Sequence, residues 1–198
     1  QAERPAPHAE PFGCRLYRGA SAVGRDPAGT AGLNTAIIFN TCAVTAEAER
    51  QARQAIRRAR RDNPDAQIVV TGCAAQIAPD SWSSMAEVDH VIGNHDKLSQ
   101  AAWMSVAEGC EAIIVSDVMA VREMATHMMD GFHAHTRGFL QIQQGCDHRC
   151  TFCIIPYGRG NNRSAGLTQI IDAAQQLVDG GSVEVVLTGV DITSWGSD

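Results

Sequence analysis

The sequence predicts an α/β protein made of a parallel-sheet domain followed by the beginning of a (β/α) barrel. Two observations carry this prediction. Short apolar segments alternate with helical segments along most of the 198 residues, as in chains whose parallel strands are joined by helices. Cysteines also follow directly on two of these segments, where open parallel sheets bind their ligands. We expect the first domain at 1–120, a linker at 121–136 and a truncated, partial barrel at 137–198.

The first 35 residues show the least regular pattern of the chain. Two prolines interrupt Ala6–Pro11, the segment that would form a strand leading to Cys14. The residues after Leu16 are rich in glycine and proline, which disfavours a helix: Gly19, Gly24, Pro27, Gly29 and Gly32. The first strand and first helix are therefore the least certain elements of the predicted sheet.

The next segments predict a strand followed by a helix. Ala36–Asn40 is short and apolar, as expected of a buried strand, and Thr41-Cys42 follows it. Thr45 is placed to cap a helix that would run to about Arg61, before the proline at position 64 ends it. Acidic residues at the start of this segment suit the positive end of the helix dipole.

This helix would have two different faces. One is made of small apolar residues that suit close packing on a sheet: Ala48, Ala52, Ala55, Ile56 and Ala59. The other is made of arginines: Arg50, Arg53, Arg57, Arg60 and Arg61. An arginine face can contact RNA phosphates, although plain exposure to solvent is the commoner reason for such a face. Both interpretations stay open from the pattern alone.

A second strand, Gln67–Thr71, ends at Gly72-Cys73 and completes a repeat. Because the carboxyl ends of parallel strands meet at one edge of a sheet, we expect Cys42 and Cys73 to lie close together, with Cys14 beside them. Three thiols at one edge can bind a metal cluster. The alternative is that these cysteines are small apolar residues at buried strand ends.

The remainder of the first domain predicts four shorter elements. They are a helical turn at 80–85, a strand at 90–92, a helix at about 96–108 and a strand at 112–115. Cys110 follows the helix with no other cysteine near it in sequence, and we expect it to be structural.

The second part again alternates strand and helix. We expect a strand at 138–143, a polar loop at 156–160, a helix at 167–178 that ends at Gly180-Gly181, and a strand at 183–187. The turn Thr188–Asp191 follows this last strand. Two parallel strands only begin a barrel, so we interpret the chain as a fragment.

Three cysteines, Cys146, Cys150 and Cys153, follow the strand at 138–143 with the spacing C-x3-C-x2-C. An odd number of thiols cannot all pair as disulfides, and three close thiolates can bind one soft metal centre. Four thiolates saturate a 4Fe-4S cluster, so three leave one iron open to a small molecule. The alternatives are a zinc site with His148 as fourth ligand, or inert buried cysteines.

Composition narrows the class of protein. The formal net charge is −6, which argues against non-specific RNA binding by this chain alone. The sequence shows no signal peptide and no apolar run of the ~20 residues that a membrane span needs. Seven cysteines without a secretion signal favour a reducing compartment and metal chemistry, so we expect a cytoplasmic protein with no membrane partner.

Several motifs together resemble the radical S-adenosylmethionine (SAM) methylthiotransferase family. The resemblance covers most of the chain: Gly13–Leu16, Asn40–Glu49, Thr71–Gln76, Gln144–Cys153 and Thr188–Asp191. Within that family, Cys14-Arg15-Leu16 and Asn40–Glu49 resemble the branch that acts on N6-threonylcarbamoyladenosine (t6A) at position 37 of tRNA. The family usually has asparagine where this chain has Tyr17, and a C-terminal RNA-binding domain that we expect to be absent here.

The resemblance implies a transferase that inserts a methylthio group at C2 of the adenine, with two 4Fe-4S clusters and SAM as cofactors. Cys146, Cys150 and Cys153 would hold the cluster that binds and cleaves SAM. Cys14, Cys42 and Cys73 would hold an auxiliary cluster that carries the sulfur. Phe152 would lie near the adenine of SAM, and Thr188, Gly189 and Asp191 near its methionine part.

The partners implied are tRNA, an electron donor such as flavodoxin and a sulfur donor; the oligomeric state is not indicated. Two other functions stay open. One is methylthiolation of an aspartate of ribosomal protein S12, which another branch of the family performs. The other is a non-catalytic fragment that binds an iron–sulfur cluster or zinc.

Overall fold

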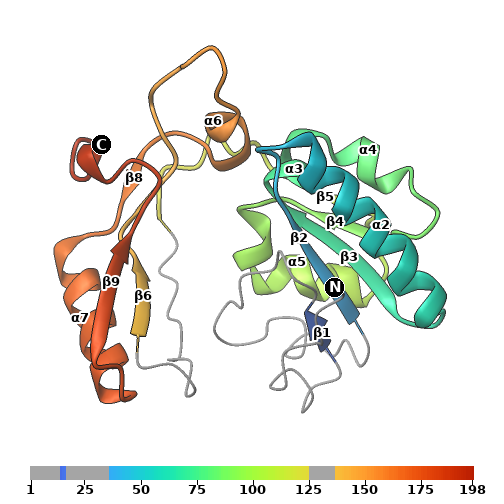
Figure 1. Ribbon diagram of the computed structural model, residues 1–198, viewed down its shortest axis with the longest axis horizontal. Coiled ribbons are helices and arrows are strands. Elements are labelled where there is room, and N and C mark those ends of the chain that lie inside the picture. The colour runs from blue at the N-terminus through green and yellow to red at the C-terminus, as the bar shows by residue number, and fades with distance from the viewer. Residues whose placement is uncertain (1–13, 17–35, 125–136) are drawn as a thin grey trace. The chain divides into compact units, whose positions relative to one another are not determined.

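The computed structural model describes residues 14–16, 36–124 and 137–198 (Figure 1). The predicted strand at 6–11, the glycine-rich segment after Leu16 and most of the predicted linker lie outside these residues. The chain divides into two compact units, and the main break follows Val118. We describe each unit by itself.

The first unit is built on a sheet of five parallel strands whose spatial order equals their order in sequence. The strands are β1 (Cys14–Leu16), β2 (Ala36–Thr41), β3 (Gln67–Gly72), β4 (His90–Ile92) and β5 (Ile113–Ile114). The central strands β2 and β3 are almost entirely buried, as expected of parallel strands covered on both faces. The predicted parallel α/β sheet is therefore confirmed.

Helices cover both faces of this sheet. They are α2 (Ala46–Asp62), α3 (Cys73–Ile77), α4 (Pro79–Ser83), the 3-10 helix η2 (Asp96–Leu98) and α5 (Gln100–Ala107). Alternate strand residues divide between two cores. Ile37, Ile68 and Val91 pack with residues of α2, α3 and α4, whereas Ile38 and Val69 pack with Trp103 of α5. Figure 1 shows α5 on the opposite side of the sheet from α2.

Helix α2 forms as its sequence predicts. The Thr45 hydroxyl accepts a hydrogen bond of 3.2 Å from the Ala48 amide, which caps the first turn. Ile56 and Ala59 are buried against the sheet, and Asn63 ends the helix by donating to the Ala59 carbonyl.

The arginine face of α2 is largely engaged within the unit. The Arg53 guanidinium lies 4.2 Å from the centre of the Trp82 ring and donates to Ser81. Arg60 donates to the carbonyls of Ala66 and Glu87 and forms an ion pair with Asp89. These residues fasten α2 to the segments around it, so packing explains much of a pattern that also suggested RNA binding.

We expect Arg53→Ala to lower the free energy of unfolding by about 1 kcal/mol, because it removes the ring contact and two hydrogen bonds. Arg58→Ala is the matched control on the same helix, since Arg58 pairs with Asp62 only at the surface and should cost less than about 0.5 kcal/mol. Chemical denaturation monitored by tryptophan fluorescence compares the two. Equal losses would contradict a packing role for Arg53.

The predicted helix at 96–108 is wrong in one respect: it is broken at Ser99. The Trp103 indole donates at 2.8 Å to the Lys97 carbonyl, a group that a continuous helix would use for its own next turn. The buried Asp96 carboxylate accepts hydrogen bonds from the amide and the hydroxyl of Ser116. These contacts between distant residues explain why the helix stops after η2 and starts again as α5.

The second unit opens as a strand–helix–strand unit. Strand β6 (Arg137–Gln141) pairs in parallel with β9 (Glu184–Thr188), and α7 (Leu167–Asp179) connects them and packs on them. A short antiparallel pair, β7 (Gln143–Gln144) and β8 (Arg163–Ser164), follows the end of β6. The two parallel strands agree with the beginning of a barrel.

Two shorter elements of this unit differ from prediction or add to it. Residues 156–160 were expected to form a polar loop, but most of them belong to helix α6 (Ile155–Arg159), with Pro156 in its first turn and buried. The 3-10 helix η3 (Ile192–Ser194) follows the turn after β9. Across the described residues, no helix has the length and apolar character needed to cross a membrane.

Candidate functional site

The loop with three cysteines joins β7 to α6. It begins at Gly145, whose φ of +76° favours glycine and whose added Cβ would lie 1.9 Å from the Asn161 carbonyl oxygen. This close approach lets the Cys146 amide donate to the Gly160 carbonyl at 3.1 Å. Glycine at position 145 therefore allows the start of the loop to lie close to the residues that follow α6.

The three thiols of this loop are free. Cys150 is exposed, Cys146 and Cys153 are half-buried, and none forms a disulfide. The Cys153 amide donates to the Cys150 carbonyl at 3.0 Å, so these two cysteines lie on one tight turn. Three unpaired thiols within eight residues match the soft ligands that an iron–sulfur cluster requires, and the donor set fits that group.

Polar side chains fix the loop backbone between these cysteines. The Arg149 guanidinium donates to the carbonyls of Cys146 and His148 and, at 2.5 Å, to the Asn161 side chain. The Asp147 carboxylate accepts a hydrogen bond of 2.9 Å from the Asn162 amide. These hydrogen bonds hold the loop backbone against the segment at 161–162.

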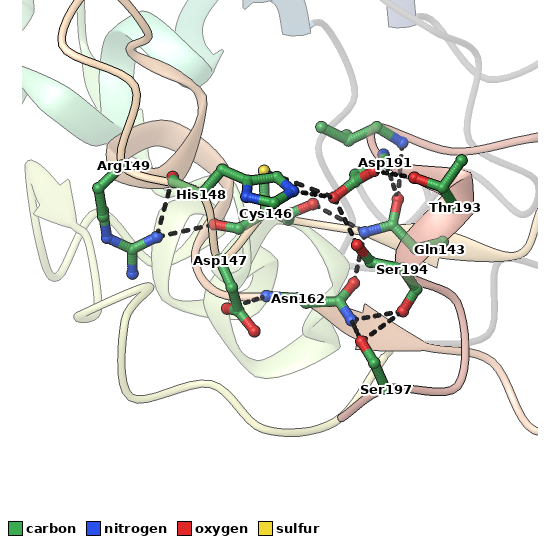
Figure 2. A network of polar contacts seen from close by, with 12 residues as sticks. Gln143, Cys146, Asp147, His148, Arg149, Asn162, Asp191, Thr193, Ser194 and Ser197 are labelled. Carbon is green, nitrogen blue, oxygen red and sulfur yellow. Dashed lines mark hydrogen bonds and ion pairs between the residues drawn. The ribbon is translucent and has the colours of Figure 1, made fainter.

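Gln143 connects the start of the loop to the turn after β9, and it is fully buried. Its amide nitrogen donates to the Gly145 carbonyl at 2.8 Å and to the Asn162 side chain at 2.6 Å. Its amide oxygen accepts from the amides of Val190 and Asp191, both at 2.7 Å (Figure 2). No role was predicted for this residue, because a glutamine beside a second glutamine gives no sequence signal of burial.

The turn Thr188–Asp191 lies against Gln143 as a consequence. Gly189 leaves no room for a side chain there, since an added Cβ would lie 2.9 Å from the Gln143 amide oxygen. Asp191 accepts hydrogen bonds from the hydroxyls of Thr193 and Ser194. These bonds, first that from Ser194, together with nearby His148 hold the pKa of the Asp191 carboxyl below its usual value.

The structure joins the loop to this turn through side chains as well. The Asp191 carboxylate lies 3.9 Å from the Cys146 sulfur and 3.3 Å from Nε2 of His148. Among the described residues, these three form the one group whose ligand atoms all lie within 4.8 Å of one another. The three loop thiols are not gathered so closely, but thiolates on different irons of a cluster need not be.

Phe152 stands apart from these contacts, and its side chain is 90% exposed. An exposed aromatic ring between two cysteines in sequence is available to a ligand.

In the first unit, the structure brings two predicted cysteines to one edge. Thr41 and Gly72 are paired neighbours at the ends of β2 and β3, and Cys42 and Cys73 follow them directly. The Thr41 hydroxyl donates to the Thr71 carbonyl at 2.6 Å and accepts from the Ala75 amide, which joins the two strand ends. Cys42 is exposed and Cys73 is half-buried, and neither is in a disulfide.

Cys14 does not follow this arrangement. In the register of β1 and β2, Cys14 lies beside Ala36, the first residue of β2, whereas Cys42 comes after the last residue of β2. The expectation that Cys14 lies at the carboxyl edge with the other two is therefore not met by the backbone of β1. The unusual sequence around Cys14, which departs from the family pattern, is consistent with this difference.

Asn94, for which no role was predicted either, is buried beside Cys73. Its side-chain nitrogen donates to the Cys73 sulfur at 3.5 Å, and its backbone amide donates to the Gln76 side chain at 2.8 Å. Gln76 in turn donates to the Ser116 carbonyl at 2.8 Å. Buried amides therefore support the carboxyl edge of the first unit, as Gln143 does in the second.

We expect Gly72→Ala to cost about 2–3 kcal/mol of unfolding free energy. Gly72 has a φ of +98°, and an added Cβ would lie 2.3 Å from the Thr41 carbonyl oxygen, so both strain and overpacking contribute. Gly109→Ala separates backbone strain from overpacking, because Gly109 has a φ of +67° and no atom within 4 Å of an added Cβ. Strain alone should lower the free energy of unfolding by about 1 kcal/mol there. Denaturant titration of both variants measures the two losses of unfolding free energy. Equal losses would show that the contact with Thr41 does not contribute to the cost at Gly72.

Comparison with known proteins gives two family matches. Residues 22–93 match the model of the uncharacterized protein family UPF0004, and residues 140–196 match the model of the radical SAM superfamily. The second match includes the cysteine loop and the turn Thr188–Asp191, and the first includes Cys42 and Cys73.

Several curated relatives match most of this chain. The threonylcarbamoyladenosine tRNA methylthiotransferase of Rickettsia prowazekii is 49% identical over 187 residues, which are 94% of this chain and 44% of the relative. Its namesake in Bacillus subtilis is 41% identical over 81% of this chain and 36% of its own length. The ribosomal protein uS12 methylthiotransferase of an Anaeromyxobacter species is 33% identical over 82% of this chain and 34% of its own length. The chain thus spans less than half the length of these relatives.

Proposed function

Because the chain belongs to the radical SAM methylthiotransferase family, we propose that the protein is a tRNA methylthiotransferase that acts on t6A at position 37. Such an enzyme replaces the hydrogen at C2 of the adenine with a methylthio group. The observation that carries the proposal is the cysteine loop, whose three thiols form no disulfide and whose backbone accepts hydrogen bonds from the buried Gln143 and the exposed Arg149.

Membership of the radical SAM superfamily implies SAM and an iron–sulfur cluster as cofactors. Cys146, Cys150 and Cys153 would hold that cluster. When bound, the cluster supplies the electron that cleaves SAM. The protein's own residues position the reactants: Gln143 holds the loop and the turn Thr188–Asp191 together, so a ligand bound at the loop would meet this turn.

The groups around the loop suit SAM in a simple way. The hydrogen bond from Ser194 and the neighbouring groups lower the pKa of Asp191, and a carboxylate attracts the positively charged amino group of a methionine. Thr188 and Gly189 lie in the same turn and would lie beside that part of SAM. The exposed ring of Phe152 is free to pack on the adenine.

A second cluster would be held by Cys42 and Cys73, which follow paired residues at one edge of the sheet. The family resemblance names Cys14 as the third ligand, and the register of β1 would have to change for its backbone to reach that edge. Reconstitution of a Cys14→Ala variant tests this point: loss of the second cluster supports Cys14 as a ligand, and its retention excludes Cys14.

Identity favours a tRNA substrate over ribosomal protein S12. The two tRNA enzymes named above are 49% and 41% identical to this chain, against 33% for the enzyme named for uS12. A tRNA substrate would place the protein in the cytoplasm, and the chemistry would need an external electron donor and a source of sulfur.

The deciding experiment measures both products in cells. A strain that lacks the gene is complemented with the full chain of the natural protein, and digests of its tRNA and of protein uS12 are analysed by mass spectrometry. We expect 2-methylthio-t6A to return in tRNA and the uS12 aspartate to stay unchanged. Modification of uS12 without change in tRNA would replace the proposed function with the ribosomal one.

A further inference from the structure

We propose that the cluster-free chain binds one divalent metal ion of the zinc class through Cys146, His148 and Asp191. The three ligand atoms are Sγ of Cys146, Nε2 of His148 and a carboxylate oxygen of Asp191, and all lie within 4.8 Å of one another. A thiolate, an imidazole and a carboxylate are a donor set that zinc prefers. This site shares Cys146 with the cluster site, which would use Cys150 and Cys153 in place of His148 and Asp191.

The distances between the donors fit a tetrahedral ion. Zinc–ligand bonds of about 2.0–2.3 Å place a nitrogen and an oxygen about 3.3 Å apart, and a sulfur and an oxygen about 3.5 Å apart, at tetrahedral angles. The observed separations are 3.3 Å from His148 Nε2 to Asp191 Oδ2 and 3.9 Å from Cys146 Sγ to the same oxygen. The third pair, Cys146 Sγ and His148 Nε2, lies within 4.8 Å, so the thiol would have to approach the imidazole by up to about 1.3 Å to reach the ~3.5 Å of a tetrahedral site.

The ligands are also held in place by other contacts. Asp191 is 16% exposed, and the hydroxyls of Thr193 and Ser194 orient its carboxylate, as the partners of ligating carboxylates do in metal sites. Gln143 binds both the Asp191 amide and the carbonyl that precedes Cys146. The turn and the loop therefore keep their relative positions, so binding an ion would require little further ordering of these two segments.

The side open to solvent belongs to His148, which is 69% exposed. Solvent would supply the fourth ligand there, as in zinc sites with three protein ligands. Figure 2 shows the His148 ring directed toward Asp191, and Arg149 on the other side of His148 in that view. The Arg149 guanidinium donates to the backbone carbonyls of Cys146 and His148 and to the Asn161 side chain, so its hydrogen bonds go to these oxygens and not to the three ligand atoms.

The site has a consequence for assembly, and this part rests on the proposed function. Cys146 would be a ligand both of the single ion and of the cluster, so the two are mutually exclusive. The ion would protect Cys146 in the cluster-free chain and would have to leave before the cluster is built.

The test titrates the cluster-free full chain with Co²⁺, a spectroscopic substitute for Zn²⁺, under anaerobic reducing conditions. We expect one equivalent to bind with the visible bands of a tetrahedral ion and a charge-transfer band of a single thiolate. His148→Gln and Asp191→Asn should each weaken binding at least about tenfold, and Cys146→Ala should remove the thiolate band. Because His148 is exposed, its substitution should leave the fold intact, which circular dichroism verifies.

The loop itself supplies the matched controls. Cys150→Ala and Cys153→Ala should bind Co²⁺ as the unmodified chain does. A charge-transfer band of three thiolates that weakens in these two variants, or binding unaffected by both His148→Gln and Asp191→Asn, would overturn the proposal. Iron–sulfur reconstitution of His148→Gln separates this inference from the proposed function, since cluster loading depends on the cysteines and cobalt binding depends on His148.

Discussion

Replacing Cys150 with alanine is expected to abolish the cleavage of SAM by the reconstituted full chain. The loop has three thiols for the cluster, and a chain with two of them would not retain it. The loss should exceed the roughly 100-fold effect that is typical of a change beside a metal ligand. Cys150 is exposed, and the turn that contains it uses its backbone carbonyl, so alanine should leave the loop fold in place.

Metal analysis should show where the loss occurs. If both clusters form in the unmodified chain, iron falls from about eight to about four atoms per chain in Cys150→Ala, because each cubane holds four. Cys110→Ala is the control, since Cys110 is an exposed cysteine of the first unit outside both sets. Partial desolvation of the thiol and its hydrogen bond to Glu108 raise the pKa of Cys110, which makes it a poor thiolate ligand. Cleavage that survives in Cys150→Ala would show that this thiol is not a cluster ligand.

Local sequence patterns were sufficient for the long elements. Strands β2 and β3 and helix α2 lie where apolar runs, a threonine cap and a proline stop predict them. The parallel pairing of β6 with β9 across α7 likewise follows from the strand–helix–strand order. These elements are long enough that their hydrophobic pattern is clear even where single residues depart from it.

Short elements and long-range contacts were not predictable in this way. Helices α3 and α6 have five residues each, too few to show a helical period. The break between η2 and α5 depends on Trp103 and on Ser116, which is twenty residues from Asp96. The register that separates Cys14 from Cys42 is likewise a property of strand pairing, which spacing in sequence does not reveal.

The sequence predicted the candidate ligands of the site, but not the buried side chains that hold them in place. The cysteine spacing identified Cys146, Cys150 and Cys153, and the family resemblance identified the turn at 188–191. Gln143, Asn162 and Asn94 were missed because the burial of an amide depends on partners far away in the chain. Such buried amides are stable only when every polar group is bound, so they are informative once a structure is known.

The second large effect is expected at Gln143. Gln143→Met keeps the length of the side chain but removes five hydrogen bonds, the longest of them the 3.2 Å bond to the Gln144 carbonyl, from a fully buried position. At about 1 kcal/mol for each bond, the second unit should lose about 4–5 kcal/mol of unfolding free energy. Gln175→Met is the matched control, because Gln175 is exposed on α7 and bonds only Asp179; it should change stability by less than about 0.5 kcal/mol.

Hydrogen exchange locates the effect within the second unit. The amides of Val190 and Asp191 donate to the Gln143 side chain, so deuterium uptake at these two residues should rise in Gln143→Met and stay unchanged in Gln175→Met. Cobalt affinity of the cluster-free chain should fall in the same variant, because Gln143 holds Asp191 and the residue before Cys146 together. If the Val190 and Asp191 amides stay protected while stability falls, another group binds them, and Gln143 does not couple the turn to the cysteine loop.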